Sequence, residues 1–126
     1  MAVAFDASSE SHTGTTASTS EASFSWTHTP VGTPAGVYVF TFSALATTAT
    51  DAATGVTYNG VALENCKPLS AVDTASEPCN LRVWRHTGVP STGAQTVAVT
   101  RLNDTTRVYA VCVTVTAGTT YTGRRR

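Results

Sequence analysis

Side chains that could perform chemistry are few in this sequence and widely spaced. Its three histidines, His12, His28 and His86, show neither the HxH nor the HxxxH spacing of a metal site. Its three cysteines include no CxxC pair, and no GxSxG, P-loop or GxGxxG motif is present. The sequence therefore predicts that the protein is not an enzyme and binds no metal or cofactor.

The carboxylates also lack the arrangement that acid–base catalysis needs. A glycosidase places two carboxyl groups on fixed elements that face one cleft. The segment DTASE at 73–77 offers oxygen ligands without the spacing of an EF-hand calcium loop. Beyond residue 22 the carboxylates fall mostly in expected loops: Asp51, Glu64, Asp73, Glu77 and Asp104. We expect neither a glycosidase nor a calcium site from these positions.

The two tryptophans point to binding or packing. Trp84 shares its strand face with Arg82 and His86, so we expect its ring to be exposed, in a subunit contact or over an arginine. An exposed tryptophan can also stack on a sugar, so a glycan is a possible ligand. Trp26 shares a face with Phe24 and is expected to be buried. Trp84 is therefore a predicted interaction residue.

A short basic tail, Arg124, Arg125 and Arg126, is the other predicted interaction site. Such a tail can contact nucleic acid, an acidic partner or only solvent. The formal net charge of the chain is zero, which gives no electrostatic case for nucleic acid or a membrane as the main partner. Charged residues are only 13%, so copies repel one another weakly, and we expect a homo-oligomer.

The N-terminus and the cysteines predict the compartment. MAVAFDASSE has neither the basic start nor the apolar core of a signal peptide, and no apolar run approaches the roughly 20 residues of a membrane span. We therefore expect folding in a cytoplasm, where an odd cysteine count argues against a disulfide framework. A bond between Cys66 and Cys79 is the open alternative. Cys112, within VYAVCVTV, is expected to be a buried thiol.

Residues 54–63, TGVTYNGVAL, give the strongest local structural signal. Asn59-Gly60 is typical of a two-residue type I′ turn, which needs positive φ at both positions. Apolar residues recur at every second position on both sides of it: Val56, Tyr58, Val61 and Leu63. This predicts an antiparallel hairpin with Asn59 and Gly60 as its structural turn.

The rest of the chain reads as further strands. Thr and Val are abundant and helical periodicity is absent, which favours pleated strands. Residues 36–45 are the most apolar and covered on both faces, so we place them centrally in a sheet. His28, on an apolar strand face, is expected to be a hydrogen-bonded core or rim residue. With the two hairpin arms, the expected strands are 2–5, 23–29, 36–45, 80–87, 94–101 and 106–116.

These strands predict one all-β domain in a chain of 126 residues. The fold is a single antiparallel β-sandwich of jelly-roll type with about eight strands; an immunoglobulin-like sandwich is the alternative. Residues 1–22 are an N-terminal strand and polar arm, in which 7–22 form a loop. Residues 23–118 are the sandwich and 119–126 the C-terminal basic tail.

Four segments together resemble a known family: FSWTHTPVGTPAGVYVFTF, VTYNGVALE, LRVWRHTGVPSTGAQTVAV and VYAVCVTVTAG. They resemble a β-sandwich domain of tailed-phage virion proteins, which also occurs in bacterial surface and secreted proteins of concanavalin-like or jelly-roll architecture. The chain departs from that pattern at His86-Thr87 and after Gly118, where further strands usually follow. The resemblance implies a structural or adhesive role and an open sheet edge after the last strand.

The expected function is that of a phage virion structural protein, made in the host cytoplasm. A small capsid decoration or head-fibre protein would bind the shell through arm and edge-strand contacts. Its partners would be other copies, as a trimer by resemblance, and the major capsid or other virion proteins. The alternative is a receptor- or carbohydrate-binding module of a tail fibre or tail tip.

Overall fold

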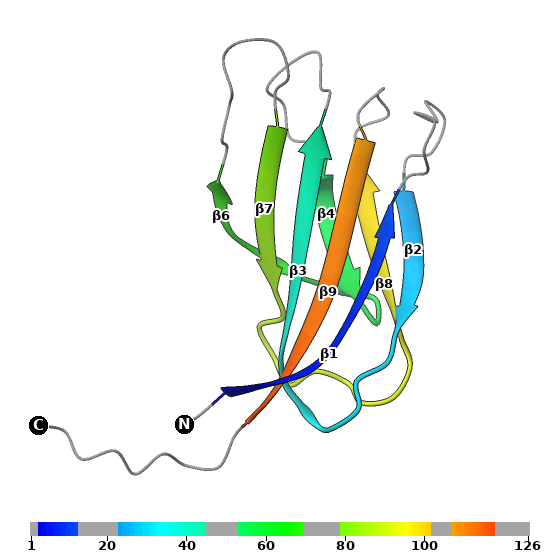
Figure 1. The fold of residues 1–126 in the computed structure, drawn as a ribbon, viewed down its shortest axis with the longest axis vertical. Coiled ribbons are helices and arrows are strands. Elements are labelled where there is room, and N and C mark those ends of the chain that lie inside the picture. The colour runs from blue at the N-terminus through cyan, green and yellow to red at the C-terminus, as the bar shows by residue number, and fades with distance from the viewer. Residues whose placement is uncertain (1–2, 13–22, 45–52, 70–78, 102–106, 118–126) are drawn as a thin grey trace, which may run out of the picture.

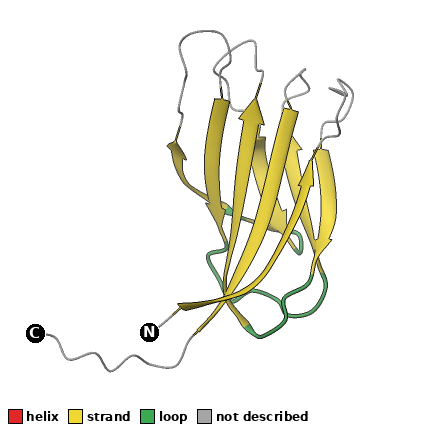
Figure 2. Cartoon of the chain, in the orientation of Figure 1, coloured by secondary structure: helices red, strands yellow, loops and turns green. Residues whose placement is uncertain are grey.

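The computed structural model describes residues 3–12, 23–44, 53–69, 79–101 and 107–117. Within these ranges the chain forms nine strands and no helix (Figure 2). The strands are β1 (Val3–His12), β2 (Ser23–His28), β3 (Pro34–Ala44), β4 (Ala53–Tyr58), β5 (Val61–Ala62), β6 (Glu64–Leu69), β7 (Cys79–Arg85), β8 (Gln95–Arg101) and β9 (Arg107–Ala117).

The strands form two antiparallel sheets that pack face to face. One sheet has five strands in the order β1-β9-β3-β7-β6, and the other has four in the order β2-β8-β4-β5 (Figure 1). The pairs β1–β9, β2–β8, β3–β7 and β4–β5 are nested like a long hairpin wound over both sheets. This is the jelly-roll arrangement, so the predicted fold class is confirmed. The immunoglobulin alternative groups its strands differently.

The predicted open edge beside the last strand is wrong. β9 lies between β1 and β3 and pairs with both, so its backbone is covered on each side. The five-stranded sheet ends instead at β1 and β6. β3 is the middle strand of that sheet, which confirms the central position expected for residues 36–45.

β1 is longer than the sequence suggests. The stretch from Ala7 to His12, which we expected to be part of a loop, continues the strand and pairs with β9 as far as Tyr109. The inward positions here are small, with Ala7, Ser9 and Ser11 half-buried. Because no large apolar residue alternates along this stretch, nothing local in the sequence marks it as a strand.

β6 is the other strand that the sequence did not predict. The second hairpin arm leaves the four-stranded sheet after Ala62, and the buried Leu63 carries the chain across to the five-stranded sheet. There β6 pairs with β7 as an edge strand. Pro68 is compatible with this position because an edge strand leaves one row of its N–H groups unpaired.

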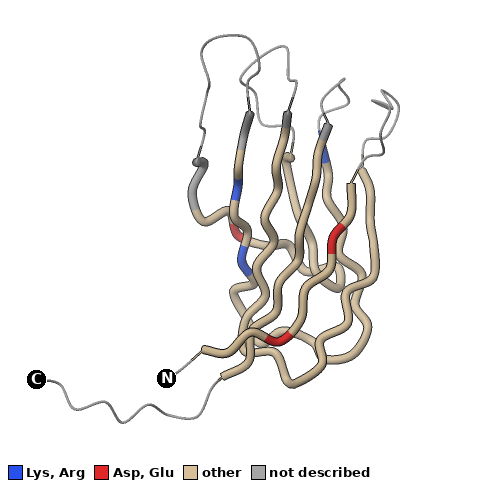
Figure 3. Tube along the Cα trace, in the orientation of Figure 1, with Lys and Arg blue, Asp and Glu red and all other residues tan. Residues whose placement is uncertain are grey.

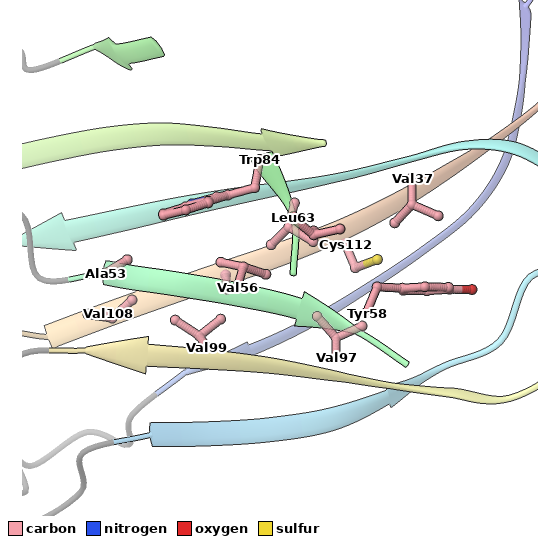
Figure 4. Close-up of a cluster of buried hydrophobic side chains, with 12 residues drawn as sticks. Val37, Ala53, Val56, Tyr58, Leu63, Trp84, Val97, Val99, Val108 and Cys112 are labelled. Atoms are coloured by element: carbon pink, nitrogen blue, oxygen red, sulfur yellow. The ribbon is translucent and has the colours of Figure 1, made fainter. Parts of the chain in front are cut away.

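The core lies between the two sheets and consists mainly of valine with a few larger side chains. Trp84, Tyr58 and Leu63 project into the space between the sheets, where they meet valines from both layers (Figure 4). The buried apolar set is Val37, Val39, Ala53, Val56, Tyr58, Leu63, Trp84, Val97, Val99, Val108, Ala110 and Cys112. Phe24 and Trp26 of β2 pack against it from the side.

The Asn59-Gly60 turn is confirmed. Asn59 has φ of 50° and Gly60 has φ of 75°, both in the left-handed region that a type I′ turn requires. Around the turn Tyr58 pairs with Val61. The Asn59 side chain adds an anchor, because its Nδ2 donates to Ser91 Oγ at 3.0 Å. The turn therefore fixes both the register of the hairpin and its contact with the β7–β8 loop.

Replacing Asn59 and Gly60 together by alanine should lower the free energy of unfolding by about 1–3 kcal/mol. Each alanine would have to adopt positive φ, and such strain costs about that much. Chemical denaturation monitored by tryptophan fluorescence measures the change. Gly55→Ala is the control, because φ of Gly55 is not positive and the added Cβ would lie 4.0 Å from its nearest neighbour, Thr100. A double variant as stable as the control would contradict the turn assignment.

Candidate functional site

A chain of five polar side chains crosses the interior between β1, β2 and β9. Trp26 Nε1 donates to Ser9 Oγ at 2.8 Å, and Ser9 Oγ lies 2.7 Å from His28 Nδ1. His28 Nε2 lies 3.1 Å from Thr114 Oγ1, which donates to Asp6 Oδ2 at 2.9 Å. We call these five residues the buried relay.

The geometry of the buried relay determines the tautomer of His28. Thr114 donates its only hydroxyl proton to Asp6, so it must accept the proton of His28 Nε2. His28 Nδ1 then carries no proton and accepts the hydroxyl of Ser9. Each donor has one acceptor, as a buried polar network needs. His28 is 0% exposed, and burial lowers its pKa despite the opposing charge of Asp6.

Asp6 joins the relay to the loop between β2 and β3. It occupies the bulge between Phe5 and Ala7, so its side chain points into the sandwich with that of Ala7. Its oxygens accept the N–H groups of Gly32 at 2.7 Å and Val31 at 3.2 Å. Desolvation acts to raise the pKa of Asp6, but hydrogen bonds from Gly32, Thr114 and Val31 outweigh it and lower the pKa.

Ser9 and His28 stand at the distance of a nucleophile and its base. The His28 ring is completely enclosed, and a lone pair of Ser9 Oγ already accepts the indole N–H of Trp26. The Ser9 hydroxyl and both ring nitrogens of His28 are therefore already engaged within the protein. The described part of the chain also holds no group of three His, Cys, Asp or Glu side chains that could bind a metal ion.

An exposed apolar surface lies on the outside of the five-stranded sheet, the sheet in front in Figure 1. Tyr38 is 38% and Phe42 43% exposed. The expectation that both faces of β3 are covered is therefore wrong for its outward side. We call this surface the outer face and define it by outward positions of β3, β7 and β9: Tyr38, Phe40, Phe42, Leu81, Val83, Tyr109, Val111, Val113 and Val115.

Polar groups line the two margins of the outer face. On the β6 side, Arg85 forms an ion pair with Glu64 at 2.8 Å. On the β1 side, Glu10 accepts the hydroxyl of Tyr109, and this hydrogen bond raises the pKa of Tyr109. An apolar centre with polar margins is the usual anatomy of a protein interface.

A second exposed apolar group lies where the first and last strands leave the sandwich. Val3 and Phe5, at the start of β1, are each 68% exposed, and Val31 in the adjoining loop is 87% exposed. The backbone of Val31 is held against β1 by Asp6. Val3 pairs with Ala117 at the end of β9. We call Val3, Phe5 and Val31 the terminal end.

The prediction that Trp84 is exposed is wrong. Its side chain is 4% exposed and lies between the sheets, where Nε1 donates to Thr41 Oγ1 at 3.0 Å. The polar neighbours on its strand face suggested solvent. Arg82 nevertheless faces inward as well and is half-buried, and desolvation lowers its pKa. Trp84 is therefore a core residue and offers no surface for a sugar or a partner.

The other predictions for single residues have mixed outcomes. His28 is a hydrogen-bonded core residue, as expected, whereas Trp26 is only half-buried. Cys112 is buried as expected, and desolvation raises its pKa to about 12. Cys66 is an exposed free thiol, so it forms no disulfide here. The tail Arg124–126 lies outside the described residues.

Sequence reasoning missed most of the buried relay. Asp6 and Ser9 stood in the expected arm, and Thr114 stood among valines. Their meeting depends on the pairing of β1 with β9 across the whole chain, for which no local pattern exists. Only His28, by its place on an apolar strand face, gave a signal.

Comparisons with protein-family models, with curated proteins and with solved structures find no match to this chain. The resemblance to phage virion domains therefore stays a prediction. Among the described residues, no helix is present that is long and apolar enough to cross a membrane.

A His28→Gln variant should remove a pH dependence that the relay imposes on stability. Burial keeps the pKa of His28 below its unfolded value, so below about pH 6.5 the unfolded chain binds the additional proton and unfolding becomes easier. Asp6, whose pKa is also lowered on folding, adds its own loss only below about pH 4. The free energy of unfolding should thus fall from about pH 7 to about pH 5 in the wild type and change less in the variant.

Urea denaturation at each pH measures this slope. Val89→Gln, at an exposed position of the β7–β8 loop, is the control and should keep the wild-type slope. Equal slopes in wild type and His28→Gln would show that the buried relay does not hold His28 neutral.

Proposed function

We propose that the protein is a structural protein of a phage virion, a capsid decoration or head-fibre protein that binds the shell through β1 and the terminal end. The observation that carries the proposal is the exposed apolar group formed by Val3 and Phe5 on the edge strand β1 and by Val31 in the adjoining loop. An edge strand offers unpaired N–H and C=O groups to a partner strand, and exposed side chains beside it give specificity.

The fold supports this proposal as an analogy. Jelly rolls occur in viral capsid and lectin domains, and a fold by itself does not determine a function. The sequence resemblance points to the first of these groups. The enclosed His28 and the bonded Ser9 support a scaffold in preference to a catalyst.

Burial of the terminal end supplies a plausible amount of binding energy. Full burial of a Val or Phe side chain contributes about 1.5–3 kcal/mol. Three such side chains give modest affinity after the cost of association. A shell presents many copies of one site, so an oligomeric decoration protein gains the remainder through multivalent attachment.

The alternative of a receptor- or carbohydrate-binding module has lost the residue on which it rested, because Trp84 is buried. Phe5, Tyr38 and Phe42 are exposed aromatic side chains of the five-stranded sheet. A glycan array probed with the wild type and with Tyr38→Ala tests this alternative. Specific binding that the variant loses would favour it over the virion role.

The virion role predicts that a Phe5→Asp variant attaches to capsids at least about tenfold more weakly than the wild type, since a loss of 1.4 kcal/mol is tenfold in affinity. The measurement is co-sedimentation with capsids of the phage that encodes the chain. These capsids are prepared without the chain, and decorated particles are then imaged. Val89→Asp, at an exposed position of the β7–β8 loop, is the matched control. Capsids that bind wild type and Phe5→Asp equally, or particles that lack the chain, would contradict the proposal.

A further inference from the structure

We propose that the outer face is a two-fold contact between two copies of this chain, packed sheet against sheet. The inference goes beyond the proposed function and does not depend on the chain being part of a virion. It rests on five properties of the outer face, which are its composition, its shape, its charge, its strand order and its area.

The composition of the outer face fits another sheet. Valines such as Val83, Val111 and Val113 stand beside the rings of Phe40 and Phe42 in adjacent strands. Branched and aromatic side chains that alternate in this way interdigitate with those of a facing sheet, as they do inside sandwiches. β3 carries no charged residue along its whole length, Pro34–Ala44. β9 carries none from residue 108 to its end at Ala117 (Figure 3).

The shape of the outer face is less suited to a sugar. The rings of Phe42 and Tyr109 lie with centroids 6.2 Å apart and are tilted by 50°. They therefore form no common plane on which a sugar ring could stack. The valines beside them, such as Val83 and Val111, offer no hydrogen bond to sugar hydroxyls, so the chemistry of this surface favours a protein partner of similar apolar character.

The charges of the outer face allow two identical copies to meet. Arg85 is already paired with Glu64 on the same copy. Glu10 is engaged by the Tyr109 hydroxyl at the opposite margin. The formal net charge of the whole chain is zero. Self-contact therefore brings no like-charge repulsion to the apolar centre, whereas a strongly charged partner would find nothing to pair with there.

The strand order suits a two-fold axis that runs along β3, the middle strand. β9 and β7 flank β3, so rotation about this axis lays β9 of one copy over β7 of the other. By register this places Val111 opposite Val83 and Tyr109 opposite Leu81, since each pair shares a row through Phe40 or Phe42. Apolar positions thus meet apolar positions in these two rows, whereas in the row of Tyr38 the same rotation places Val113 opposite Arg85.

The outer face together with its polar margins on β1 and β6 approaches the area of a standard contact. Five strands about 4.8 Å apart, with about eight residues rising about 3.4 Å each, give a footprint of roughly 600 Å². Protruding side chains raise the accessible area above this footprint. A standard interface buries about 800 Å² on each partner. A face-to-face contact of this kind closes at two copies, which differs from the trimer expected by resemblance.

Sedimentation velocity of the full chain tests the inference. The wild type should sediment as a dimer, and Phe42→Glu should sediment as a monomer while keeping the wild-type circular dichroism. Val89→Glu, exposed away from the outer face, should stay dimeric. A monomeric wild type, a trimer, or a dimer that survives Phe42→Glu would overturn the inference.

A second measurement does not depend on a disruptive variant. In a Cys66→Ser, Cys79→Ser background, Val113→Cys presents one thiol on the outer face, because Cys112 is buried. Its maleimide labelling should be about tenfold slower at concentrations where the chain is dimeric than after dilution, since an interface core excludes water. Val89→Cys should label at one rate throughout. A Val113→Cys rate that is independent of concentration would overturn the inference.

The two proposals can fail separately. Loss of shell attachment in Phe5→Asp with an intact dimer would concern only the virion role. A monomer that still decorates capsids would overturn only the two-fold contact. Attachment that depends on Phe42 in a monomeric wild type would assign the outer face to the shell and so overturn the contact between copies.

Discussion

The pairing of β9 with β1 on one side and β3 on the other is the constraint on which most of this structure depends. It fixes which side of β9 faces the core, and the smaller residues Ala110, Cys112 and Thr114 are the ones enclosed. The larger residues of the same strand consequently face outward. A strand with apolar residues on both faces is typical of a position between two layers, and this is the reason why we propose a second copy of the chain over the outer face.

The same pairing creates the polar interior along β1. Asp6 reaches the core because of its bulge, and the relay through Thr114 and His28 satisfies groups that would be costly to bury alone. The relay fastens an edge strand that has few apolar side chains of its own to contribute. Polar bonding thus replaces apolar packing at this margin of the core.

Sequence reasoning succeeded where the determinants are local. The Asn59-Gly60 turn follows from backbone chemistry, and the central place of β3 follows from its composition. It failed where distant pairing decides, as for β6 and the second half of β1. The prediction for Trp84 failed for another reason. Both faces of β7 mix apolar and charged residues, so the alternation along the strand does not show which face points to the core. The apolar row of the outer face is visible in the sequence, but its exposure can be predicted only when the order of the strands in the sheet is known.

The nested topology has a consequence for how the chain folds. β1 cannot pair until β9 exists, and the two are separated by almost the whole sequence, so the contact of highest sequence separation is formed last during synthesis. Until then β1 and the edge of β3 that β9 later covers are available to other chains. During this time the unpaired first strand of one chain can pair with a neighbouring chain. Exchange of an identical strand between two chains is a low-cost route to a dimer.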